Sequence, residues 1–153
     1  MAAGDTTIFH QAKVDFGNKV FDFDSDTFKL GLVTSSVTPA ATDAGPHFGG
    51  TGTTNYASNE VSAGGNYSTG GITLANLSFS NSGGTVSWKA DKASLAYNAS
   101  NPTNARWGII YDNTDANKRA VGFIDLGEVL DLSKGPFEWR FNSVDGNGTI
   151  FSY

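Results

Sequence analysis

Three aspartates at alternate positions, Asp22, Asp24 and Asp26, are the residues of this chain whose spacing could bind a metal ion. Calcium loops of the EF-hand type take oxygen ligands from positions 1, 3 and 5, turn at a glycine in position 6 and close on a glutamate in position 12. Counted from Asp22, position 6 is Thr27 and position 12 is Val33, so this template fails twice. We therefore predict a turn in which Asp26 or Ser25 hydrogen-bonds nearby backbone. Phe21 and Phe23 should face the core, and the aspartates should face water. Another calcium geometry is the alternative.

Other catalytic or metal-binding patterns have less support. The histidines, His10 and His47, lack a metal-ligating partner at helical or strand spacing. A Ser-His-Asp triad is defined by geometry, but no G-x-S-x-G segment precedes a predicted helix. A glycosidase pair such as Glu60 with Glu128 has no support beyond the presence of both residues. We expect no enzyme activity, no cofactor and no metal.

Charge and composition restrict the partners. Ten Lys and Arg against fifteen Asp and Glu give a net charge of -5, which repels nucleic acid and anionic membrane surfaces. The chain has no cysteine, so disulfides and thiolate metal sites are excluded. It also has neither a signal-peptide pattern nor an apolar run of about 18 residues. We expect a soluble protein that binds neither nucleic acid nor membrane.

The elements that must position these residues are mainly strands. Nineteen glycines and nineteen aromatic residues, with many Ser, Thr and Asn, are typical of short strands joined by tight turns. We predict an all-β fold, an antiparallel β-sandwich of jelly-roll type, with residues 1–20 as an N-terminal arm or short helix. Residues 21–153 form the single sandwich domain. The helix lies in residues 8–18, capped by Thr6 or Thr7 and ended by Gly17.

Alternation of apolar and polar residues predicts the strands. Residues 27–33 form a half-buried strand in which Phe28, Leu30 and Leu32 share one face. Residues 71–79 change phase near Ala75, which indicates a bulge or a strand that changes faces. The first predicted hairpin joins residues 71–79 to residues 85–90 through a turn at 80–84. The others are the central pair, 105–112 with 118–127, and a closing pair, 137–143 with 148–153.

One long loop, residues 36–56, interrupts this pattern with two prolines, four glycines and little periodicity. Long loops in compact domains are usually functional or disordered. We therefore expect the loop and the N-terminal arm to supply a protein interface. The candidate contact residues are Thr6, Phe9, His47, Phe48 and Tyr56.

Several segments in this order resemble small β-sandwich structural proteins of tailed bacteriophages. They are AKVDFGN, DSDTFKLGLVTSS, EVSAGGNYSTGGITL, ARWGIIYDNT, KRAVGFIDLG and DGNGTIFSY. The similarity runs from about Thr6 to Tyr153, and DSDTFKLGL and the pair YDNT with VGFIDLG are its most specific parts. The resemblance implies a non-enzymatic virion protein, most like a capsid decoration or cement protein that binds the major capsid protein lattice as a homotrimer. It implies a place on the capsid exterior after assembly in the bacterial host cytoplasm.

Two other functions remain as alternatives at this stage. The first is a tail, fibre or neck-associated phage module, which could bind a host glycan. Sugars stack on exposed aromatic rings, and the candidates are Tyr56, Tyr67, Tyr97 and Tyr153. The second is a cell-wall hydrolase.

Overall fold

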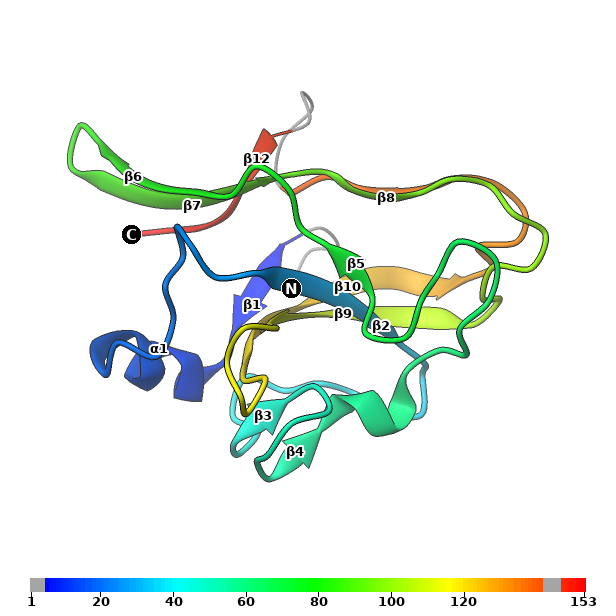
Figure 1. Ribbon diagram of the computed structural model, residues 1–153, viewed down its shortest axis with the longest axis horizontal. Helices are drawn as coiled ribbons and strands as arrows, with labels where there is room; N and C mark the ends of the chain where they lie inside the picture. The colour runs from blue at the N-terminus through cyan, green and yellow to red at the C-terminus, as the bar shows by residue number, and fades with distance from the viewer. Residues whose placement is uncertain (1–4, 142–146) are drawn as a thin grey trace.

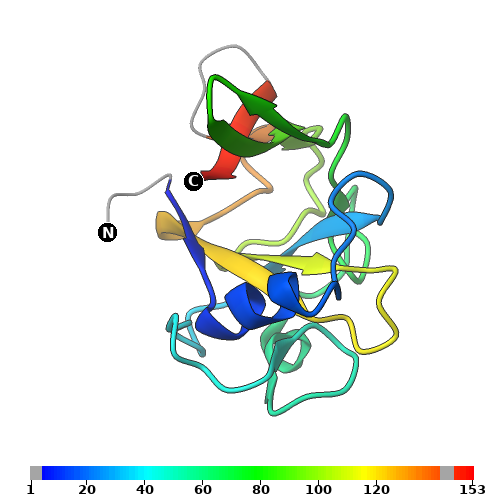
Figure 2. The ribbon, with the colours of Figure 1, turned by 90° about the vertical axis from the view of Figure 1, so that its left-hand side faces the viewer.

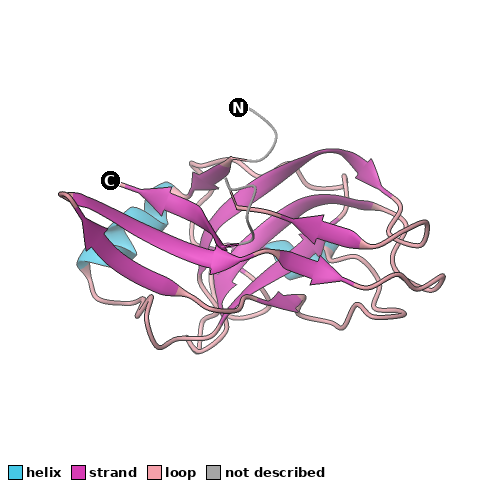
Figure 3. Cartoon of the chain, turned by 90° about the horizontal axis from the view of Figure 1, so that it is seen from above, coloured by secondary structure: helices cyan, strands magenta, loops and turns pink. Residues whose placement is uncertain are grey.

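The protein is described here by a computed structural model, which covers residues 5–141 and 147–153. In chain order the elements are β1 (Thr6–Ile8), α1 (His10–Gly17), β2 (Phe28–Val33), β3 (Pro46–His47), β4 (Thr54–Asn55), the 3₁₀ helix η1 (Tyr56–Asn59), β5 (Ile72–Thr73), β6 (Ser78–Ser82), β7 (Thr85–Asp91), β8 (Ala93–Leu95), β9 (Ala105–Asp112), β10 (Ala120–Leu130), β11 (Phe137–Trp139) and β12 (Asn147–Ser152). Strands dominate the described residues, among which two short segments are helical; Figure 3 shows the excess of strand over helix. None of the helices in the described part of the chain is long and apolar enough to cross a membrane.

Three layers build the molecule (Figure 1). The middle layer is a five-stranded antiparallel sheet in the order β1-β10-β9-β2-β5. Above it lie a three-stranded sheet, β12-β7-β6, and the pair β11-β8. Below it lie α1, η1 and the parallel pair β3-β4. The all-β, sandwich-like prediction is confirmed, whereas these sheets do not establish a jelly-roll strand order.

The central hairpin is confirmed by the pairing of β9 with β10. Gly122 lies opposite Ile110, and Ile124 lies opposite Gly108, on two strands that are buried over most of their length. Strand β2 pairs with the other side of β9, so β9 is the middle strand of the sheet. Apolar residues at nearly every position suit strands that are covered on both faces.

Strand β2 is more buried than predicted, and the long loop is the reason. Leu30 and Leu32 face the upper layer, but Gly31 and Val33 on the other face are buried as well. The ring of Phe48 covers Gly31: a Cβ built there would lie 2.3 Å from Phe48 Cζ. Residues 36–56 therefore form part of the core, because they carry β3, β4 and the ring that closes the lower face of the sheet.

Aromatic side chains fill the space between the middle and upper layers. Phe23 lies 4.6 Å from Trp88 and 5.5 Å from Phe28, measured between ring centroids. Phe28 and Trp88 make an edge contact at 4.7 Å. The prediction that Phe21 and Phe23 face the core is confirmed, since both are buried. Aromatic pairs at such distances contribute about 0.5–1.5 kcal/mol each beyond the area they bury.

Two strand predictions need correction. Residues 71–79 do not form one bulged strand: β5 belongs to the middle sheet and β6 to the upper sheet, and Asn76 between them has a φ of 51°. The prediction of a closing hairpin is wrong, because β11 pairs with β8 and β12 pairs with β7. The turn predicted for that hairpin falls largely on residues 142–146, outside the described residues. The β6–β7 hairpin is confirmed, with Gly83 and Gly84 in its turn.

The N-terminal segment belongs to the sandwich. Helix α1 is confirmed, but Thr6 and Thr7 do not cap it: they lie in β1, and Phe9 occupies the N-cap position without a side-chain hydrogen bond. Strand β1 is an edge strand of the middle sheet, paired with β10. Phe9 and Ala12 are fully buried. Residues 6–17 therefore belong to the fold, as an edge strand and a helix, and do not form a free arm.

Candidate contact surface at two open sheet edges

The aspartate ladder forms the turn that precedes β2, as predicted. The backbone N–H groups of Asp24 and Ser25 each donate to Asp22 Oδ1 at 3.1 Å, and the N–H of Asp22 donates to Asp26 Oδ2 at 2.8 Å. The hydrogen bonds from Ser25 and Asp24 lower the pKa of the Asp22 carboxyl. In the described parts of the chain, no three His, Asp or Glu side chains are arranged to hold a metal ion. The turn accounts for the ladder.

Four of the five predicted contact residues lie inside the fold. Phe48 stacks on Tyr111 at 4.7 Å, and Phe9 stacks on Tyr56 at 5.6 Å. The hydroxyl of Tyr56 donates to Asp43, and burial raises its pKa. These three aromatic side chains, of Phe9, Phe48 and Tyr56, are buried, because their rings cover the lower face of the middle sheet, so they do not form part of the exposed surface of the chain.

His47 is also buried, and burial lowers the pKa of its imidazole. Its place in β3, beside the buried Phe48, makes it a core residue. Thr6, the fifth predicted contact residue, is partly exposed. It is therefore the one candidate of the five that is not buried.

Glu60 and Tyr67 have structural partners. The Tyr67 hydroxyl accepts from the backbone N–H of Leu32 at 2.9 Å and donates to Glu60 Oε1 at 2.9 Å. The same Glu60 oxygen accepts from the N–H of Gly70 at 2.7 Å. Burial raises the pKa of Tyr67. These contacts fasten residues 60–70 to β2.

A groove lies between β1 and β12. It encloses about 760 Å³ and is lined by residues of β1, α1 and β12. Thr6 and Ile8 line one side, and Ser152 and Tyr153 line the other. His10 of α1, which the sequence analysis considered as a metal ligand, also lines this groove together with Thr6. Figure 2 shows that the end of β12 lies on the same side of the molecule as β1.

Both strands that border the groove are sheet edges. β1 ends the middle sheet, and β12 ends the three-stranded sheet. The N–H of Phe9 donates to Val121 O at 3.1 Å, and this antiparallel register turns the backbone groups of Thr6 and Ile8 away from β10. Tyr153 exchanges two hydrogen bonds with Val86, at 2.8 and 3.0 Å.

The two hydrogen bonds between Tyr153 and Val86 determine which way the backbone groups of β12 point. Because alternate residues of an antiparallel strand point their N–H and C=O groups to opposite sides, those of Ser152 point away from β7. The groove thus presents backbone donors and acceptors from two edges. Such edges bind extended polypeptide by adding a strand.

Sequence reasoning missed Ile8 and Ser152 as site residues. Ser152 lies in a segment, 148–153, that was predicted as a strand, but the error in its pairing hid its position at an edge. Ile8 was included in the helix. A strand signal of three residues is too short to distinguish from a helix start, so no sequence pattern would have placed β1.

Comparisons with protein-family models, with curated proteins and with solved structures find no match for this chain.

Proposed function

We propose that the protein is a non-enzymatic structural component of a bacteriophage virion, which decorates the capsid by binding the major capsid protein lattice, as a homotrimer. The observation that carries this proposal is the groove between β1 and β12, where two open sheet edges expose backbone groups at one site. An extended segment of a neighbouring protein would add to these edges through main-chain hydrogen bonds. The resemblance of DSDTFKLGL and of the β9–β10 hairpin to phage structural proteins supplies the virion context.

Repetition on a lattice favours contacts of this kind. A short edge such as β1 offers few hydrogen bonds, so one contact binds weakly. A subunit that meets several neighbours binds more tightly, because each further contact forms at a high effective concentration. Standard protein interfaces bury about 1,600 Å² in total, an area that several small contacts of one subunit reach together.

Copy number tests the proposed location. Quantitative mass spectrometry of purified virions would count this chain against the major capsid protein. Hundreds of copies for each particle support decoration of the capsid. A dozen or fewer would instead support the tail, fibre or neck location, and absence from the particle would refute a virion role.

A single substitution tests the groove itself. Thr6→Pro removes the N–H that points out of the sheet, and proline is compatible with edge strands for this reason. Thr6→Val is the matched control, because it changes the side chain and keeps the N–H. We expect Thr6→Pro to lower occupancy on capsids that lack the native protein, while Thr6→Val retains it. If Thr6→Pro and Thr6→Val both show native circular dichroism and occupy the capsid equally, the β1 edge is not part of the interface.

A further inference from the structure

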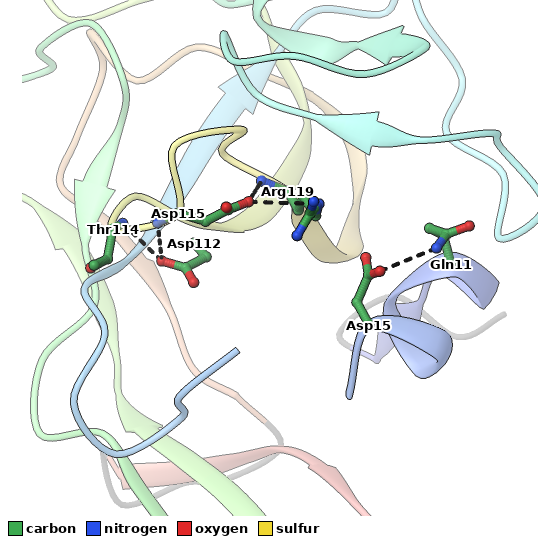
Figure 4. Close-up of polar contacts among 6 residues, drawn as sticks. All are labelled: Gln11, Asp15, Asp112, Thr114, Asp115 and Arg119. Atoms are coloured by element: carbon green, nitrogen blue, oxygen red, sulfur yellow. Dashed lines mark hydrogen bonds and ion pairs between the residues drawn. The ribbon is translucent and has the colours of Figure 1, made fainter. Parts of the chain in front are cut away.

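Asp112, the last residue of β9, is a buried acid that the proposed contact surface does not use. It is 0% exposed. Its Oδ1 atom accepts from the backbone N–H of Thr114 at 2.8 Å and from that of Asp115 at 3.1 Å (Figure 4). These bonds form the turn that joins β9 to β10. One oxygen of the carboxyl is therefore fully occupied by the turn.

The other oxygen, Oδ2, is buried and has no hydrogen-bond partner among the described residues. The acid that interacts with the Asp112 carboxyl is Asp26, in the turn before β2. Asn113 N–H donates to Thr27 O at 2.8 Å, and Thr27 N–H donates to Thr114 Oγ1 at 2.8 Å. These bonds hold the two acids together. Two ionised carboxylates in this position would repel each other, with no donor between them.

Other charges near this pair are already engaged. Lys118 Nζ binds the backbone and side-chain oxygens of Asn113, at 3.2 and 3.0 Å. Arg119 Nε lies 3.9 Å from Asp115 Oδ2, and the same oxygen accepts from the backbone N–H of Arg119 at 3.1 Å. On the other turn, Asp22 is occupied by backbone amides. Within residues 5–141 and 147–153, Asp26 is the one charged side chain that acts directly on the Asp112 carboxyl.

We propose that Asp112 and Asp26 share one proton in mildly acidic solution, and that loss of this proton toward neutral pH loosens the junction between the two turns. In the shared state one carboxyl O–H donates to the carboxylate oxygen of the other. Ionisation releases that proton to solvent and leaves two negative charges in contact.

The pKa of the Asp112 carboxyl agrees with this geometry. Burial raises it to about 6, the amides of Asp115 and Thr114 oppose that rise, and Asp26 adds to it. A raised pKa in the folded state means that stability from this group is complete below the ordinary pKa of 3.8. It is lost as the pH rises through about 6.

The junction also anchors the lower layer. The N–H of Thr51 donates to Asn117 O at 3.2 Å, and the N–H of Phe48 donates to Lys118 O at 3.0 Å. Both acceptors belong to the turn between β9 and β10. Loosening this turn would therefore weaken the attachment of residues 46–51 to the sheet.

Hydrogen exchange and carboxyl NMR test the proposal on the whole protein. Opening returns Asp112 to its ordinary pKa, so protection of the Phe48 and Thr51 amides should fall roughly tenfold between about pH 5 and pH 7.5, after correction for intrinsic exchange. In Asp112→Asn the amide oxygen still accepts from the turn and the amide N–H donates to Asp26. The fall should disappear in this variant.

Asp24→Asn is the matched control, because Asp24 lies beside Asp26 in the turn before β2 and is exposed. It should keep the pH-dependent loss of protection. Direct ¹³C titration of the native carboxyls gives a readout that needs no variant to fold. Titration of Asp112 below about pH 4, or a full pH dependence in folded Asp112→Asn, would overturn the proposal.

Discussion

Gly31 and Phe48 provide the sharpest test of how the lower face of the sheet is closed. A Cβ at Gly31 would lie 2.3 Å from Cζ and 2.5 Å from Cε2 of the Phe48 ring. That ring cannot move away freely, because it stacks on Tyr111 with an interplanar angle of 12°. Gly31→Ala should therefore lower the free energy of unfolding by about 1–3 kcal/mol, the usual cost of overpacking a core.

Removal of the ring should reverse this effect. Phe48→Ala alone should cost about 3–5 kcal/mol, since the ring is 3% exposed and leaves a cavity. In that background the new methyl group of Gly31→Ala has space. The substitution should then be neutral or stabilising by about 0.4–1 kcal/mol, because alanine restricts the unfolded chain more than glycine does. The double-mutant cycle should give a coupling of about 2 kcal/mol in favour of the double variant.

Urea unfolding of the four proteins, followed by fluorescence and circular dichroism, measures this coupling. Gly17→Ala is the control for a glycine with free space, since no atom lies within 4 Å of a Cβ built at this last residue of α1. It should be neutral or slightly stabilising. Additive effects of Gly31→Ala and Phe48→Ala would refute the argument, because they would mean that the ring does not lie on Gly31.

Three further measurements test other parts of the fold. Leu30→Ala should lower the free energy of unfolding by about 2–5 kcal/mol in urea melts, because this side chain is fully buried in the middle sheet. Tyr67→Phe should cost about 1–3 kcal/mol in the same assay, since it leaves the buried N–H of Leu32 without its acceptor; a loss under about 0.5 kcal/mol would contradict this account. The Arg106 guanidinium holds the pKa of the Asp125 carboxyl below its usual value, so stability from this pair is present at neutral pH and lost as the pH falls through that lowered pKa. Arg106→Gln should remove this acid-side loss, with an effect within about 1 kcal/mol for a partly exposed pair, and an unchanged acid limb in thermal melts would contradict it.

Sequence patterns predicted the parts of the fold in which local and tertiary preferences agree. The apolar runs at 105–112 and 118–127, separated by Asn and Asp residues, indicated a hairpin covered on both faces, and β9 and β10 form it. Asp26 or Ser25 was predicted to form a turn by hydrogen-bonding nearby backbone, and Asp26 does accept from the N–H of Asp22 in that turn. Asp22, which accepts from Asp24 and Ser25, was not predicted in this role. Here short-range chemistry decides the structure.

The sequence did not predict features that depend on contacts between distant segments. Phe48 is a single aromatic residue in a loop without periodicity, so nothing local distinguishes a ring that covers Gly31 from one that faces solvent. The closing hairpin failed because β8, a strand of three residues, pairs with β11 and leaves β12 to pair with β7. Burial of Asp112 depends on the turn before β2, which lies far from it in the sequence.

The pairing of β1 with β10 also affects how the chain can fold during synthesis. Thr6 lies opposite Ile124, so most of the chain must leave the ribosome before the first strand finds its partner. At about 5–20 residues per second this delay is on the order of ten seconds. Strand β2 waits for β9 in the same way, and its apolar face stays uncovered during that time. Late closure of the middle sheet is thus a consequence of its strand order. We expect the yield of folded protein to depend on chaperones when expression is rapid.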